Sequence, residues 1–317
     1  MMIVSETIDI RERDIMSMDQ TLMNLLLLDR TTGKNIIWAT DDYRFWGDGF
    51  QAEDEITIMH ITGQYSEFIK PRISKAQESQ FNRTRDMAEV FTPAWICNAQ
   101  NNLVDESWFE RKEVFNVQQG TNWKSTEGLI VFPSEKKKDW KHYVDARRME
   151  IACGEGPYLV SRYDSATGQS IPLKDRIGLL DRKMRIVNEN AADETEWMKW
   201  VCRAFESTYG YEFQGDSLLL ARKNLFYSYL EYFRAKWQRD PDKRQMRRIA
   251  TIISWNLWQM DGMTFTIPFH TQEDEGDKQA GMFYTITEKP DPVICRIKDW
   301  RSKVTIKFVS MTKGAKA

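Results

Sequence analysis

The chain has 317 residues, and its 45 Lys and Arg residues nearly balance its 47 Asp and Glu residues. A hydrophobic content of 41% excludes a largely disordered chain and suffices for one large or two modest globular domains. The longest apolar stretch, residues 22–28, is too short to cross a bilayer, and the first residues lack the pattern of a secretion signal, so we expect a cytoplasmic protein without membrane contact.

Cysteine and histidine are too dispersed for the usual sites that they build. The four cysteines form no Cys-x-x-Cys pair, and the three histidines lie far apart in the sequence. We therefore expect neither a metal site nor a disulfide framework, and a triad hydrolase is disfavoured.

Residues 1–80 are predicted to form a small N-terminal α+β module that is rich in strands. Lys34 to Ala39 follows a Thr-Thr-Gly turn and has the composition of a strand, and Glu55 to Ile61 alternates apolar and polar residues. The polar stretch from Lys75 to Asp86 then marks a boundary, which leaves residues 81–317 as the second domain.

Longer helical patterns follow this boundary. Thr92-Pro93 predicts a helix start, with Thr92 as N-cap and Pro93 in the first helical position, and the spacing of apolar residues carries this helix to about Val104. Three further helices are predicted over residues 197–205, 216–237 and 242–258, and the second of them repeats apolar residues along one face.

The segment from Glu150 to Leu159 is the most informative one. Gly154 and Gly156 flank a single residue where a strand near Met149 turns toward a helix, and two glycines at such a turn let the backbone approach a ligand closely. A tight turn without a ligand is the simpler explanation of these two glycines taken alone.

This segment resembles motif I, the S-adenosylmethionine loop of DNA methyltransferases that methylate amino groups. The usual sequence is Asp-Pro-Ala-Cys-Gly-Ser-Gly followed by an aromatic residue and Leu. Glu150 replaces the usual Asp, and Ile151 and Glu155 depart from the usual Pro and Ser. The matching residues are Ala152, Cys153, Gly154, Gly156, Tyr158 and Leu159.

Three more segments occur in the order that this family requires. Phe91-Thr92-Pro93 resembles motif X, which folds over the methionine end of the cofactor. Residues 209–212 with residues 220–225 resemble motif II, in which an acid, here Glu212, ends a strand and binds the ribose hydroxyls. Residues 252–263 resemble motif III more loosely, with Asp261 near the adenine of the cofactor.

The family with the greatest resemblance is the restriction endonuclease subunit M, or Type II methyltransferase M subunit, and the likeness extends to the N-terminal module and to Ile297–Arg301. It implies a Rossmann-like methyltransferase fold with parallel strands near Met149, Tyr209 and Thr264. The two acids Glu150 and Glu212 are 62 residues apart, so we expect residues 165–196 to loop out as an insertion. The cofactor contacts implied by the resemblance are Phe91, Thr92, Pro93, Glu150, Ala152, Cys153, Gly154, Gly156, Tyr158, Glu212 and Asp261.

The catalytic motif of adenine N6 methylation is absent. That motif is Asn or Asp, then Pro-Pro, then Tyr or Phe, and none of the nine prolines here adjoins another. We therefore assign no catalytic residue and expect an incomplete methyltransferase domain with an exposed sheet edge, completed by a second polypeptide that carries the Asn-Pro-Pro-Tyr motif.

The predicted function is that of the cofactor-binding M subunit of a restriction-modification enzyme, which transfers methyl from S-adenosylmethionine to adenine N6 in double-stranded DNA. The basic segments 222–248 and 136–148 are expected to follow DNA phosphates. Two alternatives stay open: a non-catalytic subunit that binds S-adenosylmethionine or DNA for assembly, and a methyltransferase that acts on RNA or protein, because a cofactor loop does not report the acceptor. A nuclease role for this chain is disfavoured.

Overall fold

A computed structural model describes residue 8 and residues 10–66, 68–75, 92–270 and 292–312 of the chain. In its N-terminal part, helices α1 (Glu12–Met18) and α2 (Thr21–Leu27) precede a series of short 3-10 turns. These turns are η1 (Arg44–Trp46), η2 (Ile58–Ile61), η3 (Gly63–Tyr65) and η4 (Arg72–Ser74).

The strands predicted in this N-terminal part are wrong. Lys34–Ala39 is extended but forms only isolated bridges, between Leu28 and Asn35 and between Ile37 and Glu55. The second segment becomes the turn η2. The reason is that residues 35–39 bond on one side to the end of α2 and on the other to an irregular loop, so no regular ladder can extend.

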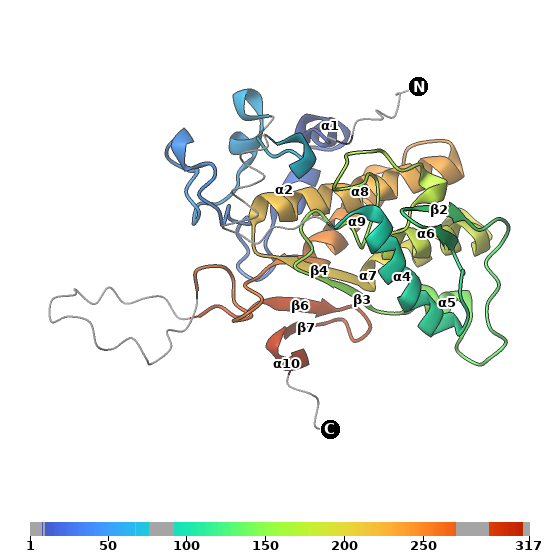
Figure 1. Ribbon diagram of the computed structural model, residues 1–317. Coiled ribbons are helices and arrows are strands. Elements are labelled where there is room, and N and C mark those ends of the chain that lie inside the picture. Colours follow the sequence, from blue (N-terminus) through green and yellow to red (C-terminus); the bar gives the residue numbers. More distant parts are fainter. Residues whose placement is uncertain (1–7, 9, 67, 76–91, 271–291, 313–317) are drawn as a thin grey trace.

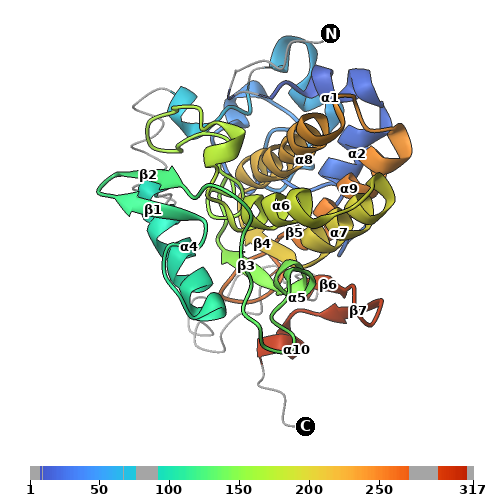
Figure 2. The same ribbon diagram turned by 90° about the vertical axis from the view of Figure 1, so that its right-hand side faces the viewer.

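The next part of the chain packs a helix against a hairpin. Helix α4 (Ala94–Phe109) lies beside the antiparallel strands β1 (Asn116–Gln119) and β2 (Asn122–Ser125), as Figure 2 shows, and α5 (Trp140–Asp145) follows. The predicted end of this helix at Val104 is wrong by five residues, because Phe109 still packs into the core.

The start of α4 also differs from the prediction. Pro93 is the N-cap residue, and the Thr92 side chain caps nothing. The carboxylate of Asp164 instead accepts the Ala94 amide at 2.9 Å. A carboxylate from a distant loop therefore does what we expected of Thr92.

A three-stranded parallel sheet forms the centre of the molecule. Its strands β3 (Arg148–Ile151), β4 (Thr208–Glu212) and β5 (Leu257–Gln259) lie in the order β3-β4-β5. The predicted strands near Met149 and Tyr209 are confirmed. The third strand lies at residues 257–259 and not near Thr264; it is fully buried and too short to show an alternating pattern.

Helices connect the parallel strands. The turn η5 (Leu173–Asp175), α6 (Leu179–Asn190) and α7 (Glu194–Glu206) join β3 to β4, and α8 (Gly215–Trp237) and α9 (Lys243–Asn256) join β4 to β5. The helices predicted over residues 197–205, 216–237 and 242–258 are thus present, with bounds shifted by up to three residues. Asp193 and Asp242 cap α7 and α9 by accepting the amides three residues later.

Residues 165–196 do not loop out as we expected. They include α6, and its residues Leu180, Met184 and Val187 are fully buried in the main core. The residues between Glu150 and Glu212 form the crossover from β3 to β4. Parallel strands need such a connection of a dozen residues or more.

The two faces of the sheet are covered differently. Leu257 faces the main core, which contains residues of α7, α8 and α9. On the opposite face, Tyr209 and Trp258 pack with Ile297 and Phe308. Ile297 belongs to a hairpin that lies below the sheet in Figure 1, and Phe308 lies between this hairpin and a short helix. These last elements are β6 (Arg296–Asp299), β7 (Val304–Lys307) and α10 (Val309–Thr312).

The N-terminal residues pack tightly on α8. The buried Arg222 donates to the carbonyl oxygens of Leu26 (2.6 Å) and Leu257, and the buried Lys223 pairs with Glu12 at 2.5 Å. A Cβ added to Gly215 would lie 1.9 Å from the carbonyl oxygen of Ile37, so only glycine fits at this contact. The predicted boundary near residue 80 falls on residues 76–91, outside the described part of the chain.

Within the described ranges, the apolar length that a membrane span requires is found in none of the helices.

Candidate functional site

The candidate site begins where β3 ends. Ala152 has φ of 51°, which turns the chain out of the strand, and the Cys153 amide then donates to the Tyr211 carbonyl at 2.8 Å. Gly154 and Gly156 have φ of 50° and 80°, and the Gly156 amide closes the turn on the Cys153 carbonyl. The glycines are thus explained by left-handed backbone, which other residues rarely adopt.

The two glycines differ in their surroundings. A Cβ on Gly156 would touch Ala221 and Leu225 of α8 at 3.6 Å, whereas a Cβ on Gly154 would project into open space. Gly154 therefore presents its backbone to the place where a ligand would lie, and Gly156 lets α8 pack against the turn.

Glu212 ends β4 directly beside this turn. One carboxylate oxygen accepts the Gly154 amide at 2.8 Å, and the other accepts the amides of Phe213 (2.9 Å) and Gln214 (3.2 Å). Burial raises the pKa of Glu212, and these three amides oppose the rise. The predicted placement of Glu212, at a strand end next to the glycine turn, is confirmed.

Glu150 lies one strand away and is buried. Its Oε1 accepts the Tyr158 amide at 3.3 Å, which fixes the far side of the turn, while its Oε2 has no hydrogen-bond partner among the described residues. Burial raises the pKa of Glu150 well above the ordinary value, and the nearby Glu212 adds to the rise. Within the described ranges neither acid takes part in an ion pair.

Cys153 lies between the two acids. It is buried, and burial raises the pKa of its thiol well above the ordinary value. A Cβ on Gly210 would meet Cys153 at 3.2 Å, so a glycine in β4 makes room for this side chain. Cys153 therefore packs under the turn, where burial disfavours the thiolate form.

The segment before α4 lies against the same turn. The Tyr158 hydroxyl interacts with the side chains of Thr92 and Cys97, and burial raises the pKa of Tyr158. Ser165 donates to the Thr92 carbonyl at 3.0 Å. The structure thus brings Thr92 next to Tyr158, while Phe91 lies outside the described residues.

Asp261 follows the third strand at the same end of the sheet. The Met260 amide donates to the Glu212 carbonyl at 3.0 Å, which links the two strand ends. One oxygen of Asp261 accepts the amides of Met263 (2.8 Å) and Thr264 (3.4 Å) and so shapes a turn. Asp261 therefore has a structural role of its own, whatever it contacts in a ligand.

The sequence analysis missed two aromatic residues at this site. Phe213 follows Glu212 directly in the chain. Its ring packs edge to face against that of Phe269, which is half exposed, with the ring centroids 5.8 Å apart. Phe213 carries a signal, because it follows the acid that ends a strand. Phe269 carries none, since it lies on a loop remote in sequence.

Part of the cations in residues 222–248, which we expected to follow DNA phosphates, is engaged within the fold. Arg222 and Lys223 are buried. The other cations that have carboxylate partners are Arg234 with Asp240, Arg239 with Glu194, Arg247 with Asp19 and Arg248 with Glu206. The two buried cations are not accessible to phosphates, and the role of the exposed ones stays a prediction. In the second basic segment, Lys138, Lys141 and Arg147 also have acidic partners.

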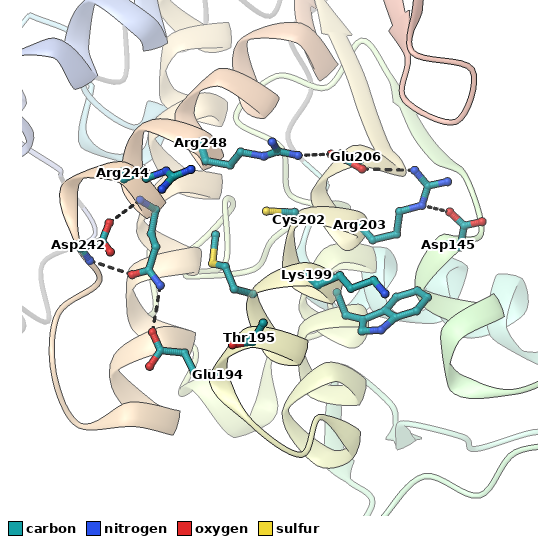
Figure 3. Close-up of a pocket in the computed structure, with 13 residues that line it drawn as sticks. Asp145, Glu194, Thr195, Lys199, Cys202, Arg203, Glu206, Asp242, Arg244 and Arg248 are labelled. Atoms are coloured by element: carbon teal, nitrogen blue, oxygen red, sulfur yellow. Dashed lines mark hydrogen bonds and ion pairs between the residues drawn. The ribbon is translucent and has the colours of Figure 1, made fainter.

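A separate groove of about 980 Å³ lies between α7 and α9 (Figure 3). Two of its acids have two arginine partners each: Glu206 contacts Arg203 (3.3 Å) and Arg248 (3.0 Å), and Asp145 contacts Arg203 and Arg301. Cys202 lies on its wall with a pKa raised to about 11 by burial. The charges of this groove are internally balanced, in contrast to those of the glycine turn.

Metal ligands do not gather anywhere in the described part of the chain, and all four cysteines are free. No family model, no curated protein and no solved structure matches this chain.

Proposed function

We propose that the chain is the S-adenosylmethionine-binding subunit of a DNA methyltransferase that methylates adenine N6 in a restriction-modification system. In this proposal a second polypeptide supplies the Asn-Pro-Pro-Tyr motif. The chain's own part is to bind and orient the methyl donor at the carboxyl ends of β3 and β4.

The strand arrangement supports a Rossmann-like fold. In chain order, β3, β4 and β5 add to the sheet in one direction and run parallel, with helical crossovers between them. This is the arrangement of one half of a doubly wound sheet, in which ligands bind outside the carboxyl ends of the strands. The glycine turn and Glu212 lie at those ends.

The observation that carries the proposal is the pair of acids without cations. A dinucleotide cofactor places an anionic pyrophosphate at its glycine turn, where the uncompensated Glu150 disfavours it, whereas an acid in the position of Glu212 binds ribose in both kinds of cofactor. S-adenosylmethionine instead carries a positive sulfonium and a ribose diol and has no phosphate. Glu212, already held by the Gly154 amide, is oriented to accept hydrogen bonds from a diol.

The DNA acceptor and the methyl transfer rest on the motif resemblance. Two observations favour the alternative, a non-catalytic subunit that binds the cofactor for assembly: the catalytic motif is absent, and five of the nine cations in residues 222–248 have carboxylate partners. Methylation assays with and without a partner that carries Asn-Pro-Pro-Tyr separate the two. DNA methylation by the purified chain alone would contradict the split enzyme.

Calorimetric titration of S-adenosylmethionine into the purified chain tests the cofactor site. We expect saturable binding that Glu212→Gln weakens strongly, weaker binding of S-adenosylhomocysteine, which lacks the sulfonium charge, and no binding of NAD. Glu206→Gln, in the α7–α9 groove, is the matched control and should bind normally. Equal binding of NAD and S-adenosylmethionine would overturn the charge argument.

A further inference from the structure

The sheet has two edges, and they differ: at β5 the Leu257 carbonyl accepts hydrogen bonds from Arg222, whereas the outer edge of β3 has no such cover among the described residues. Arg148 donates its amide to Ser207, next to β4, at 2.9 Å, so the amides of residues 148 and 150 point toward β4. The backbone groups of Met149 and Ile151 therefore point away from β4, to the edge where the described residues place no further strand.

The side chains of the same two residues are exposed. Met149 is 44% exposed and Ile151 65%, although their register partners on β4, Tyr209 and Tyr211, lie under the C-terminal hairpin and Phe308. Parallel sheets are normally covered on both faces. An open backbone edge and an uncovered apolar pair thus coincide on one strand.

We propose that this β3 edge binds an extended segment of a second polypeptide, which adds a fourth strand parallel to β3 and covers Met149 and Ile151. The carboxyl end of a strand in that direction lies beside Ala152 to Gly156. A loop that follows the strand then reaches the place where Glu150 and Glu212 face a ligand.

The partner is a different chain and not a second copy. Two-fold pairing of β3 with its own copy is antiparallel, so it would place the amino end of the copy's strand beside the glycine turn. This chain also contains no adjacent prolines, so a copy could not contribute the missing loop. This inference rests on the proposed function for the content of that loop, but the β3 edge itself is tested separately.

The test uses the full chain and a fluorescent synthetic peptide in which Val and Thr alternate before Asn-Pro-Pro-Tyr. We expect saturable binding by fluorescence anisotropy. Hydrogen exchange at the Met149 and Ile151 amides should be fast in the free chain and slower by about tenfold or more with the peptide.

Two variants remove different parts of the edge. Met149→Pro deletes an outward amide without touching the ladder to β4, which edge strands tolerate, and Ile151→Asp places a charge on the exposed face. Both should abolish peptide binding. Leu103→Asp, at a 64% exposed position on α4, is the matched control and should bind the peptide as the parent does.

The inference would be overturned by hydrogen exchange that is already slow at the Met149 and Ile151 amides of the free chain. Peptide binding that survives both variants, or no peptide binding by the parent, would also overturn it. So would a dimer in sedimentation that depends on Met149. If the edge variants still bind S-adenosylmethionine, the inference about the β3 edge can fail while the proposed function stands. If the parent binds peptide at the edge but no S-adenosylmethionine in the presence of that peptide, the proposed function fails and the edge stands.

Discussion

The glycine turn and the α7–α9 groove both bring acidic side chains together, but the acids of the groove form ion pairs and those of the turn do not. Glu206 in the groove lies between two arginines, at 3.0 and 3.3 Å. Glu150 and Glu212 are held by backbone amides alone, and one oxygen of Glu150 is buried with no partner among the described residues. On our proposal, the acids of the groove complete the fold, and those of the glycine turn bind a ligand.

This comparison also explains why the α7–α9 groove, despite its volume of about 980 Å³, is the weaker candidate for a functional site. Volume shows only where atoms are absent, whereas an uncompensated buried acid costs folding free energy that a bound cation or hydroxyl donor can recover. The glycine turn carries that unfavourable feature and the groove does not. Functional sites commonly retain such locally unfavourable features.

The largest expected effect comes from uncoupling a compensated acid. Lys223→Met leaves Glu12 buried without its cation, and we expect the free energy of unfolding to fall by about 3–5 kcal/mol in urea denaturation. The double variant with Glu12→Gln should recover most of the loss. A loss of under about 1 kcal/mol for the single variant would show that this pair does not depend on its charges.

The opposite behaviour is expected at the uncompensated acids. Glu212→Gln should weaken S-adenosylmethionine binding by about thirtyfold to a hundredfold, or roughly 2–3 kcal/mol, because charge-assisted hydrogen bonds to the ribose are lost. Its free energy of unfolding should fall by less than in Lys223→Met, since the removal of a partly buried charge offsets the one backbone amide that the new side-chain NH2 group cannot accept. Calorimetry and urea denaturation of the same preparation check both statements.

The pH dependence of stability should separate the acids by sign. Burial raises the pKa of Glu150 in the folded chain above the ordinary value of 4.5. Between 4.5 and that raised pKa the folded chain therefore holds more protons than the unfolded chain. The free energy of unfolding should fall as the pH rises through this interval, by up to about 1.4 kcal/mol per pH unit. The hydrogen bond from Arg247 lowers the pKa of Asp19 from 3.8 to about 2, so its contribution is lost as the pH falls between these values.

Urea midpoints measured from pH 2 to pH 8 check this expectation. Glu150→Gln should flatten the decline on the alkaline side, and Asp19→Asn should flatten the loss on the acidic side. An alkaline slope that is unchanged in Glu150→Gln would mean that Glu150 is not the group that titrates.

Substitutions of Gly154 and Gly156 should have smaller effects on stability and should differ in their effect on cofactor binding. Gly156→Ala and Gly154→Ala both place a side chain on left-handed backbone, at a cost of about 1–2 kcal/mol each in the free energy of unfolding. Only at Gly154 does the new Cβ enter open space beside Glu212, so Gly154→Ala should lose more cofactor affinity than Gly156→Ala. The reverse order in calorimetry would place the ligand elsewhere.

The smallest effect is expected in the groove. Glu206→Gln removes an acid from a partly exposed network, where ion pairs contribute about 0–1 kcal/mol each, and it should leave cofactor binding unchanged. A large loss of binding in this variant would transfer the functional role to the groove.

Local sequence patterns predicted the parts of the fold that depend on local chemistry. The spacing of apolar residues gave α8, Asp242 marked the start of α9, and the two glycines marked a turn with positive φ. The motif order also placed Glu212 beside Gly154, which composition alone does not indicate.

Features decided by distant residues were not predictable in the same way. Asp164 caps α4 from 70 residues away, and Gln259 satisfies the backbone of Ile37 from 222 residues away, which holds an extended segment without a regular sheet. The burial of Arg222 and Lys223 was also invisible, because a basic helix usually indicates a solvated face.

The contact of Arg222 with the carbonyl oxygens of Leu26 and Leu257 has a consequence for autonomous folding. Removing the first thirty or so residues, by protease or by truncation, would take the Leu26 and Leu28 oxygens from the guanidinium and expose the side of α8 that they cover to water. We therefore expect a chain without these residues to lose much of its stability. The N-terminal helices belong to the same folding unit as α8 and α9, on which they pack.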